Sequence, residues 1–461
     1  MRSIDVLDDP RWPELLADLS ADHQVPGAQA GVLVLDEQGN ELARRVFATG
    51  VTSLRTGVEV TRETLFQCGS ITKIWTTTLI MQLVEEGRLD LDTAVAEVLP
   101  AFTLADPEAA AAITVRHLLD HTSGIDGDIF TDTGDGDDCV ERYVADLATA
   151  RSVTRPGGPA SYCNAGFVVA GRIVEALRDA VWDEVLLDRL LRPLDLDHAA
   201  ITRAKDAPLF RVAVGHSRRP DADHVEPTTT WMLPRSIGPA GLLTASVDTL
   251  LGFAAAHLRD GVGLSGTRIL SRESTLAMQE QQVALAGMST VQEGWGLGWA
   301  REQWAGHSVV GHDGGTIGQK ASLRLFPGLR LVLAVLTNGA DGPALIRDWY
   351  AALGPQFGVE QPLPRLQPGA TTADLTPALG TYESVSERWD LRAIADGTVE
   401  LDIVSYLEDL TPTRTTTVIP LGPGRFRADL DGHQIEATHV EAEGRTFLYN
   451  GRLLPRLTAV R

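Results

Sequence analysis

Strand-like segments stand at both ends of a long helical stretch, and this placement constrains the fold more than any other feature of the sequence. Near the start, strands are predicted at 28–35 and 41–50 around the turn 36–40, which carries a hairpin signal. Late in the sequence, strands are predicted at 307–310, 321–326 and 331–337. Between 113 and 260, helical patterns alternate with loops rich in Gly, Pro and Asp. The two ends are therefore expected to form one antiparallel sheet with helices packed on it, which is an α+β fold.

The composition changes past Tyr350. Prolines at 355, 362, 364 and 368 indicate a linker, which we place at 356–372. The remaining residues, 373–461, form short alternating segments separated by turns, a pattern typical of a small β-barrel or sandwich. Seven strands are predicted there, at 381–385, 389–394, 398–403, 415–419, 425–430, 433–439 and 446–449. Two domains, 1–355 and 373–461, are therefore expected in this chain of 461 residues.

Composition excludes several classes of partner. The formal net charge is −22, whereas binding to nucleic acids or anionic membranes needs a basic surface. No segment approaches the roughly 20 apolar residues of a membrane span. The first residues include Asp5, Asp8, Asp9 and Glu14 without an apolar run. No secretory signal is therefore predicted, and a cytoplasmic location is expected.

The first candidate for chemistry is Ser70-Ile71-Thr72-Lys73, at the head of a predicted helix that runs to about Glu86 and ends at Gly87. Residues three apart on a helix share a face, so the hydroxyl and the amine are expected within hydrogen-bond reach. A partly desolvated lysine can take the proton of a serine and make it a nucleophile. The tetrapeptide alone occurs by chance in many proteins. The apolar stripe that follows it here indicates a rigid core helix, and a further amphipathic helix is predicted at 11–22.

Two further groups stand later in the chain. In Tyr162-Cys163-Asn164, a phenolate stabilised by a nearby lysine can act as a general base, and the amide can hold a substrate carbonyl. In Gly311–Gly315, glycines such as Gly314 allow close approach of a substrate, and free backbone N–H groups can help to form an oxyanion hole. Each group alone is weak evidence, because a turn tyrosine packed in the core, or a glycine-rich turn with an incidental histidine, explains it as well.

Cys68 and Cys163 each lie beside a candidate catalytic residue. They could be thiol nucleophiles. Free cysteine is among the most buried residue types, however, so the favoured interpretation is two small apolar core residues. With Cys139 the chain has three cysteines, which form no disulfide framework.

Taken together, the order and spacing of these groups resembles the serine β-lactamase and penicillin-binding-protein superfamily, particularly its class C, esterase and D-aminopeptidase-like branch. That branch carries S-x-x-K, then Y-x-N, then K-T-G or H-x-G. Supporting matches within residues 20–350 lie at Ile113–Leu119, His121–Ile125, Gly241–Thr244, Trp295–Trp299 and Leu336–Gly339. The resemblance implies that residues 1–355 form a β-lactamase/transpeptidase-like domain with an antiparallel sheet and a helical region.

The resemblance also implies roles for the candidate residues. Ser70 would be the acylated nucleophile, with Lys73 and Tyr162 sharing the proton transfers of acylation and deacylation. Asn164 would position the substrate amide. The backbone N–H groups of Ser70 and Gly315 would form the oxyanion hole, where one donor typically contributes about 3 kcal/mol of transition-state stabilisation.

His312 departs from the pattern of β-lactamases and transpeptidases, which usually carry a lysine in the third motif. It is expected to border the acyl site together with Gly314. A lysine there attracts the carboxylate of a β-lactam or peptide, whereas a histidine of ordinary pKa about 6.5 is mostly neutral at cytoplasmic pH. Efficient β-lactam turnover is therefore not expected, and esters, thioesters or amides without a free carboxylate are favoured as substrates.

The predicted layout, a β-lactamase-like domain followed by a lipocalin-like barrel, resembles stand-alone penicillin-binding-protein-type thioesterases. Those enzymes take a peptidyl thioester from a nonribosomal carrier domain and release it as a head-to-tail macrocycle. The resemblance implies a D-configured C-terminal residue on the donor. The alternative is an intracellular esterase, D-aminopeptidase or D-amino-acid amidase with the same residues. A third hypothesis is a catalytically inactive relative that binds a ligand. Docking of a carrier domain would need a local basic patch, for which the candidates are Arg189, Arg192, Arg218 and Arg219.

Two patterns suggest a metal at first sight. His117 and His121 stand at i and i+4, but the acidic residue expected between them and a third ligand are both missing from the pattern. An acidic run at 132–138 fails the EF-hand spacing, with Tyr143 where the bidentate glutamate should stand. A solvated loop is the favoured interpretation of that run, and neither a metal nor another cofactor is expected.

Overall fold

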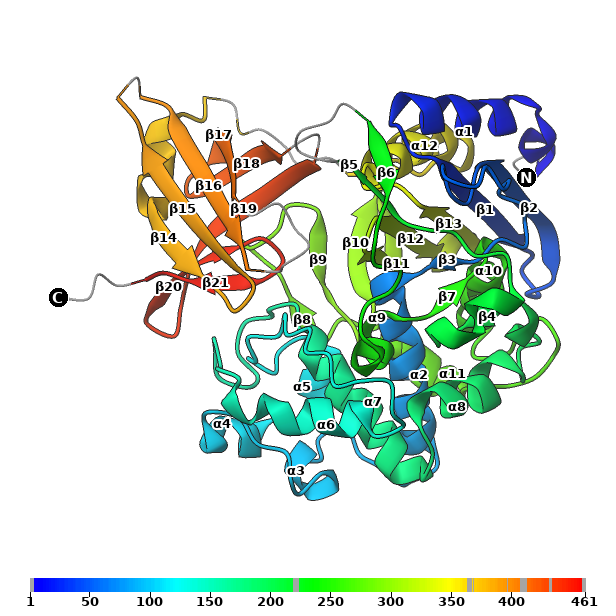
Figure 1. Ribbon diagram of the computed structural model, residues 1–461, viewed down its shortest axis with the longest axis horizontal. Helices are drawn as coiled ribbons and strands as arrows, with labels where there is room; N and C mark the ends of the chain where they lie inside the picture. The colour runs from blue at the N-terminus through cyan, green and yellow to red at the C-terminus, as the bar shows by residue number, and fades with distance from the viewer. Residues whose placement is uncertain are drawn as a thin grey trace.

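The computed structural model describes residues 4–218, 224–362, 367, 369–395, 397–406, 413–430 and 433–457. Its two parts lie side by side in Figure 1, a larger domain that runs from blue to yellow and a smaller barrel in orange and red. This agrees with the predicted α+β domain and C-terminal all-β domain. The predicted boundaries of the linker stay a prediction, although helix α12 ends at Phe357 and the next helical turn begins at Thr372.

The larger domain is built on an eight-stranded sheet in which the two ends of the sequence meet. Its strand order is β2-β1-β13-β12-β11-β10-β9-β8. Ala28 of β1 pairs with Thr337 of β13, which confirms that the ends form one antiparallel sheet. The strands are β1 (Gly27–Leu35), β2 (Glu41–Gly50), β8 (Val283–Ala284), β9 (Gln292–Trp295), β10 (Ala300–Trp304), β11 (His307–Thr316), β12 (Gln319–Phe326) and β13 (Leu331–Thr337).

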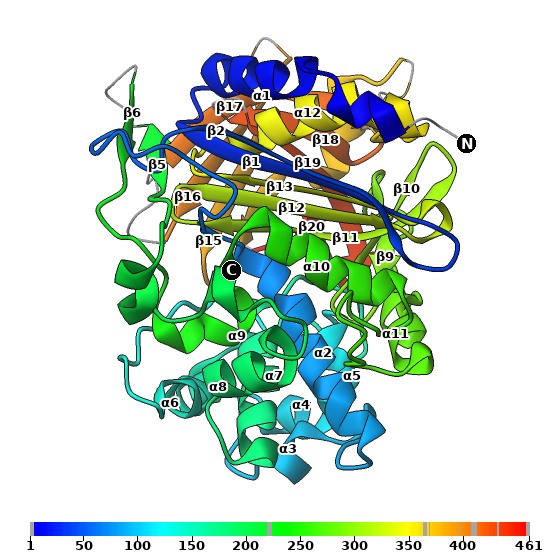
Figure 2. The same cartoon turned by 90° about the vertical axis from the view of Figure 1, so that its right-hand side faces the viewer.

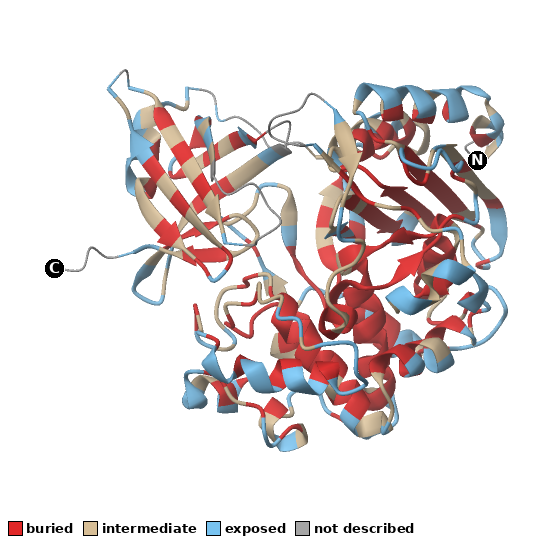
Figure 3. Cartoon of the chain, viewed as in Figure 1, coloured by how far each residue is buried: buried red, intermediate tan, exposed pale blue. Residues whose placement is uncertain are grey.

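Helices cover both faces of this sheet (Figure 2). On one face lie α1 (Arg11–Asp22) and α12 (Gly342–Phe357), where Trp12, Phe47 and Trp349 pack edge-on or tilted against one another. On the other face lie α10 (Val247–Leu258) and the helical region. Burial of apolar side chains on both faces, shown in red in Figure 3, makes this sheet the centre of the core.

The helical region is arranged around one central helix, α2 (Thr72–Glu85). All of Thr72–Leu83 is buried, and the ring of Trp75 stacks on Phe253 at 3.6 Å. The buried stretch includes threonines and Gln82 beside its apolar residues, but Lys73 is its only ionisable side chain, and burial of such a group needs a reason. The other helices are α3 (Val95–Val98), α4 (Pro107–Ala112), α5 (Val115–Leu119), α6 (Cys139–Asp146), α7 (Asn164–Arg178), α8 (Trp182–Leu186), α9 (Gly238–Gly241) and α11 (Arg272–Gln279).

Five short strands complete this domain. They pair as β3-β7-β4 and as β5-β6. Their bounds are β3 (Phe66–Gln67), β4 (Ala200–Ile201), β5 (His216–Arg218), β6 (Val225–Pro227) and β7 (Thr244–Ala245). None of the helices in the described part of the chain is both long and apolar enough to cross a membrane.

The C-terminal domain is a nearly closed antiparallel barrel. Each strand pairs with the next in sequence, and a bridge joins Tyr382 of the first strand to Arg456, the residue that follows the last strand. Seven of its strands were predicted; the eighth, β21, was missed because it has only three residues and therefore no periodicity. The strands are β14 (Gly380–Glu383), β15 (Glu387–Ala393), β16 (Val399–Ser405), β17 (Thr413–Gly422), β18 (Arg425–Leu430), β19 (His433–Ala442), β20 (Arg445–Tyr449) and β21 (Leu453–Pro455).

A small apolar cluster joins the two domains. Phe447, Tyr449 and Leu453 of the barrel pack with Trp295 and Leu285 of the larger domain, and all five are buried. Hydrogen bonds add to this contact. The amide of Tyr162 donates to the carbonyl of Gly451 at 3.0 Å, and the amide of Leu453 donates to the Ser161 hydroxyl at 3.0 Å. The hairpin β20–β21 is thus fixed against the segment that carries Tyr162.

Candidate active site

The segment before α2 presents Ser70 on a tight turn. Gly69–Ile71 forms a 3₁₀ turn, and Gly69 has φ +53°, a left-handed conformation that favours glycine. A Cβ on Gly69 would stand 2.6 Å from the amide nitrogen of Gly315, so only glycine allows β11 to approach this closely. The nucleophile predicted from sequence thus lies between a buried helix and the last residues of β11.

Lys73 lies one turn further along, with its ammonium side chain fully buried. Its Nζ is 3.0 Å from Ser70 Oγ, 2.7 Å from Asn164 Oδ1 and 2.8 Å from the carbonyl oxygen of Ala240. Burial, and after it the charge of Arg452, lowers the pKa of Lys73 well below its usual range. A neutral amine has two N–H donors and one lone pair, which match two carbonyl-type acceptors and the Ser70 hydroxyl. The geometry therefore suits Lys73 to accept the proton of Ser70.

Tyr162 faces the same pair of residues. Its ring centroid lies 4.9 Å from Lys73 Nζ and 4.4 Å from the ring centroid of His121. Burial raises the pKa of Tyr162, and a hydrogen bond with Ser70 only partly offsets this. The phenol, rather than the phenolate suggested by sequence reasoning, is therefore the favoured form at neutral pH. In this arrangement Lys73 is suited to accept a proton, and the phenol of Tyr162 is suited to donate a hydrogen bond and to relay a proton that Lys73 replaces.

Asn164, the first residue of α7, is held on both sides of its amide. Its Oδ1 accepts from Lys73, and its Nδ2 donates to Asp128 Oδ1 at 2.6 Å. Asp128 in turn accepts from Arg452 Nη2 at 3.0 Å and also pairs with its Nε. A chain of polar contacts thus runs from Lys73 through Asn164 and Asp128 to the barrel.

Neither Arg452 nor Asp128 was predicted from the sequence. Arg452 stands in the hairpin between β20 and β21, with its guanidinium carbon 4.8 Å from the centroid of the Tyr162 ring. The run Tyr449-Asn450-Gly451-Arg452 contains an Asn-Gly turn signal that could have indicated the final hairpin. No local signal indicates that this hairpin reaches a residue about 290 positions earlier in the chain.

His312 lies on β11 with its ring turned toward Tyr162, at a centroid distance of 5.9 Å. Its Nδ1 donates to the carbonyl oxygen of Asp313 at 2.5 Å, which leaves Nε2 as the unprotonated nitrogen. That Nε2 is buried without a partner among the described residues. Burial, and then the charge of Lys73, lowers the pKa of His312, so the ring is neutral, as expected from its ordinary pKa.

Gly314 and Gly315 allow β11 to pack against the 3₁₀ turn that carries Ser70. A Cβ on Gly314 would collide with the carbonyl oxygen of Cys68, so this glycine is required for the close contact of the two segments. The amide nitrogen of Gly315 lies close to Gly69, the residue next to Ser70. The two amides predicted to form the oxyanion hole therefore belong to adjoining segments. Their catalytic role, and the substrate contact predicted for Gly314, stay predictions.

The two cysteines beside the site are core residues, as favoured from sequence. Cys68 and Cys163 are buried, and burial raises the pKa of the Cys68 thiol to about 12 and that of the Cys163 thiol to about 11. Both thiols are therefore protonated at neutral pH and unsuited to act as nucleophiles. Cys163 Sγ accepts the amide hydrogen of Gly166 at 3.2 Å and caps the start of α7.

The histidine pair has structural partners. Nδ1 of His117 accepts the amide hydrogen of Thr114 at 3.2 Å, and Nδ1 of His121 accepts that of Cys163 at 3.0 Å. His121 also has φ +64°, so it leaves the helix and does not share a face with His117. Among the described residues, the group of three possible metal ligands that lie close together is elsewhere, at Asp195, Asp197 and His198, all exposed.

The acidic run 132–138 is bound to arginines. Asp137 Oδ1 accepts from Arg235 Nη2 at 2.8 Å, and Asp138 pairs with Arg142. The candidate carrier-docking arginines also have acidic neighbours, with Arg189 paired to Glu86, Arg192 to Asp188 and Arg218 to Asp341. Arg219 lies outside the described residues, and carrier docking at this patch stays a prediction.

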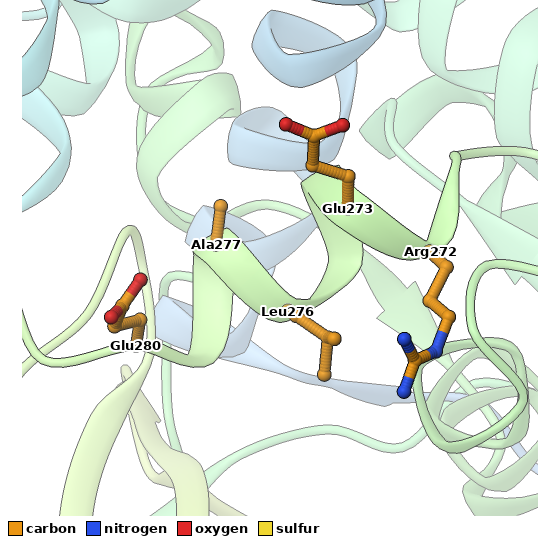
Figure 4. A pocket seen from close by; sticks show the side chains of 5 residues that line it. All are labelled: Arg272, Glu273, Leu276, Ala277 and Glu280. Atoms are coloured by element: carbon orange, nitrogen blue, oxygen red, sulfur yellow. The ribbon is translucent and has the colours of Figure 1, made fainter.

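A surface pocket of about 550 Å³ lies on α11 and is lined by Arg272, Glu273, Leu276, Ala277 and Glu280 (Figure 4). Its side chains come from α11 and the residue that follows it, and none is a predicted site residue. It is thus separate from the site around Ser70.

Comparison with known proteins identifies the family of the larger domain. Residues 12–355 match the model of the β-lactamase family. Penicillin-binding protein 4 of Amycolatopsis lactamdurans is 44% identical over 383 residues, which cover 82% of this chain and 98% of that protein.

Solved structures extend the likeness to the barrel. The structure of SurE is 28% identical with a TM-score of 0.74 and covers 97% of this chain and 98% of its own, and that of SurE with D-Leu has a TM-score of 0.71. A D-stereospecific amidohydrolase from Streptomyces sp. is 25% identical with a TM-score of 0.57. It covers 75% of this chain and 99% of its own.

Proposed function

The chain belongs to the β-lactamase family of serine hydrolases, and we propose that it is a penicillin-binding-protein-type thioesterase. In this proposal it releases a nonribosomal peptide from a carrier-bound thioester and closes it head to tail. The observation that carries the proposal is the buried Lys73, with Nζ 3.0 Å from Ser70 Oγ and its other two partners supplied by Asn164 and Ala240.

Acylation follows from this geometry. Ser70 Oγ attacks the thioester carbonyl carbon while its proton passes to Lys73, and the developing oxyanion lies at the amides of Ser70 and Gly315. The carbon–sulfur bond then breaks, and the thiolate that leaves takes a proton through Tyr162, which Lys73 replaces with the proton taken from Ser70, so that both side chains return to their neutral forms. The products are a free thiol and a peptide held as an ester on Ser70.

Ring closure is the second half of the reaction. The amino terminus of the peptide attacks the ester carbonyl and its proton passes to Lys73; the bond to Ser70 Oγ then breaks as Lys73 returns that proton to the oxygen and restores the hydroxyl. Holding both ends of one peptide in the same site favours this step over attack by water. The barrel supports the proposal because its Arg452 lies over the Tyr162 ring and holds Asp128, so the barrel forms part of the wall of the site.

The likeness to SurE with D-Leu supports a D-configured residue in the substrate, since that relative covers both domains of this chain. A second candidate is hydrolysis of D-amino-acid amides or esters. The likeness to the D-stereospecific amidohydrolase favours it, but that likeness covers three quarters of this chain.

One assay separates the two candidates. The purified protein is offered peptidyl thioesters with D- or L-configured C-terminal residues, a p-nitrophenyl ester and a D-amino-acid amide, with mass spectrometry of products and of the intact protein. We expect macrocycle from the D-terminal thioesters and a peptidyl adduct on Ser70. Turnover of the simple ester or amide alone supports the second candidate, and turnover of a peptidyl thioester by S70A contradicts the mechanism itself.

A further inference from the structure

A second cavity, of about 390 Å³, lies beside the glycine segment of β11. It is lined by residues of β11 and β12, by the first turns of α12 and by Gln361. Its cationic side chains are Lys320, Arg324 and Arg347, against Asp313 as the one carboxylate in the lining. Since the chain as a whole carries a net charge of −22, a hollow with more cations than anions stands out.

Two of these three cations are compensated by neighbouring carboxylates. Arg324 donates to both oxygens of Asp313 at 2.8 and 2.9 Å and also pairs with Glu302 at 3.1 Å. Arg347 pairs with Asp348 at 2.8 Å. Lys320 has neither a hydrogen-bond nor an ion-pair partner for its ammonium group in the described part of the chain. Lys320 is therefore the cation with which an anionic ligand would form an ion pair.

Lys320 is next to the predicted oxyanion hole. A Cβ on Gly315 would stand 3.3 Å from Lys320 Nζ, and the amide nitrogen of the same glycine would be 2.6 Å from a Cβ on Gly69. Side chains alternate between the two faces of a strand, so Asp313 and Gly315 face α12 while His312 faces Tyr162. The cavity thus lies on the opposite face of the sheet from the candidate acyl site. Gly315 of β11 stands between the cavity and that site.

Other charges in the region favour an anion. The N-terminal end of α12, which carries a partial positive charge, contributes Pro343, Ile346 and Arg347 to the lining. Burial, and then the charge of Arg414 in the barrel, lowers the pKa of Lys320. A bound anion would relieve this unfavourable arrangement of positive charges, because it would attract both groups.

We propose that this cavity binds the phosphate of the thioester donor, with Lys320 as its principal contact. The inference rests on the proposed function, in which the acyl group arrives on a carrier arm. Such an arm is a pantetheine chain attached through a phosphodiester, so its acyl end and its phosphate would lie at two neighbouring places, Ser70 and Lys320. The arm would pass around Gly315 at the end of β11.

The test uses two donors that differ only in the phosphate, namely a D-terminal peptidyl pantetheine thioester and its 4′-phosphopantetheine counterpart. We expect the full-length protein to favour the phosphorylated donor by about tenfold in kcat/KM, since one charge-assisted contact is lost without it. In K320M this ratio falls to about one. K205M, a variant of an exposed lysine, keeps the wild-type ratio. Equal kcat/KM for both donors in the wild type would overturn the inference while the proposed function stands, whereas turnover of neither donor would count against the proposed function.

A binding measurement gives a readout besides activity. The chain has three lysines, Lys73, Lys205 and Lys320, so modification by an amine-reactive reagent can be followed at each one by peptide mass spectrometry. Free 4′-phosphopantetheine is expected to slow modification of Lys320 several-fold without changing that of Lys205. Unchanged modification of Lys320, or protection by a peptide carboxylate but not by the phosphate, would contradict the proposal.

Discussion

The two large sheets of this protein differ in one strand pairing. In the barrel, every strand from β14 to β21 pairs with its neighbour in sequence. In the larger domain, β1 pairs with β13, which brings Ala28 beside Thr337, and the whole helical region is inserted between β2 and β8. The barrel is thus built from consecutive strands alone, whereas the larger sheet also needs the β1–β13 pairing between residues about 300 positions apart.

The two domains also contribute differently to the candidate site. Ser70, Lys73, Asn164 and His312 come from distant segments that only the larger sheet and its helices bring together. The barrel adds Arg452 through a single hairpin. The larger domain, which depends on contacts between distant segments, thus brings the candidate site residues together. The barrel, which is built from consecutive strands, adds the side chain of Arg452 to them. Four experiments test how far this division holds.

The largest effect is expected at the base. K73M keeps a long, buried side chain but removes the amine that contacts Ser70, so kcat/KM for a thioester or ester substrate is expected to fall by about 10²–10⁴-fold. Steady-state kinetics with K205M as the matched lysine control measure this. Activity within tenfold of the wild type would remove Lys73 from the proton transfer.

The next effect concerns the contact between the domains. F447A and F426A each remove a fully buried ring, Phe447 from the cluster between the domains and Phe426 from the interior of the barrel. Each is expected to lower the free energy of unfolding of the barrel by about 3–5 kcal/mol. Denaturant unfolding and hydrogen exchange measure this, and only F447A should also reduce activity. Equal activity losses would mean that the barrel acts through its stability alone.

A smaller effect, visible in the pH profile, is expected at Arg452. Its charge lowers the pKa of Lys73, and its removal also leaves the Asp128 charge unpaired, which raises the pKa of Lys73 further. R452A should therefore move the acid limb of the kcat/KM profile to higher pH and cost about tenfold in rate at neutral pH.

R452K keeps a cation and is expected to retain most of the wild-type acid limb. Arg445 offers a matched control, because it also connects the barrel to the larger domain, through the carbonyl of Val153 at 2.8 Å. R445A should leave the acid limb in place. A limb that stays unchanged in R452A would show that the barrel does not influence the base.

The smallest effect is expected at the exposed rim of the contact between the barrel and the larger domain. Glu443 pairs with Arg155, whose side chain is 83% exposed, so screening by solvent leaves little net attraction. E443Q is expected to change the free energy of unfolding by less than about 1 kcal/mol, with no change in rate. A larger loss in a denaturant titration would mean that the rim, rather than the apolar cluster around Phe447, holds the barrel in place.

Local patterns in the sequence predicted much of the fold. The bounds predicted for a helix at 11–22 and for strands at 41–50 and 331–337 are those observed for α1, β2 and β13. These elements have strong periodicity or long apolar runs, and such patterns indicate which of their residues are buried. Strands β8, β9 and β10, and the final strand β21, were not predicted. They have two to five residues each, too few for a pattern to distinguish them from loops.

The same distinction applies to the site. The sequence by itself determined that Ser70 and Lys73 share one turn and that a tyrosine–asparagine pair and a glycine-rich segment occur later in the chain, because spacing along the chain dictates these local relations. Only the tertiary structure decided that Asn164 shares its amide between Lys73 and Asp128, that burial keeps Tyr162 protonated, and that Arg452 of the barrel completes the chain of contacts. The physical reason is that charge and burial at one atom depend on every segment packed around it, and those segments meet only in the folded chain.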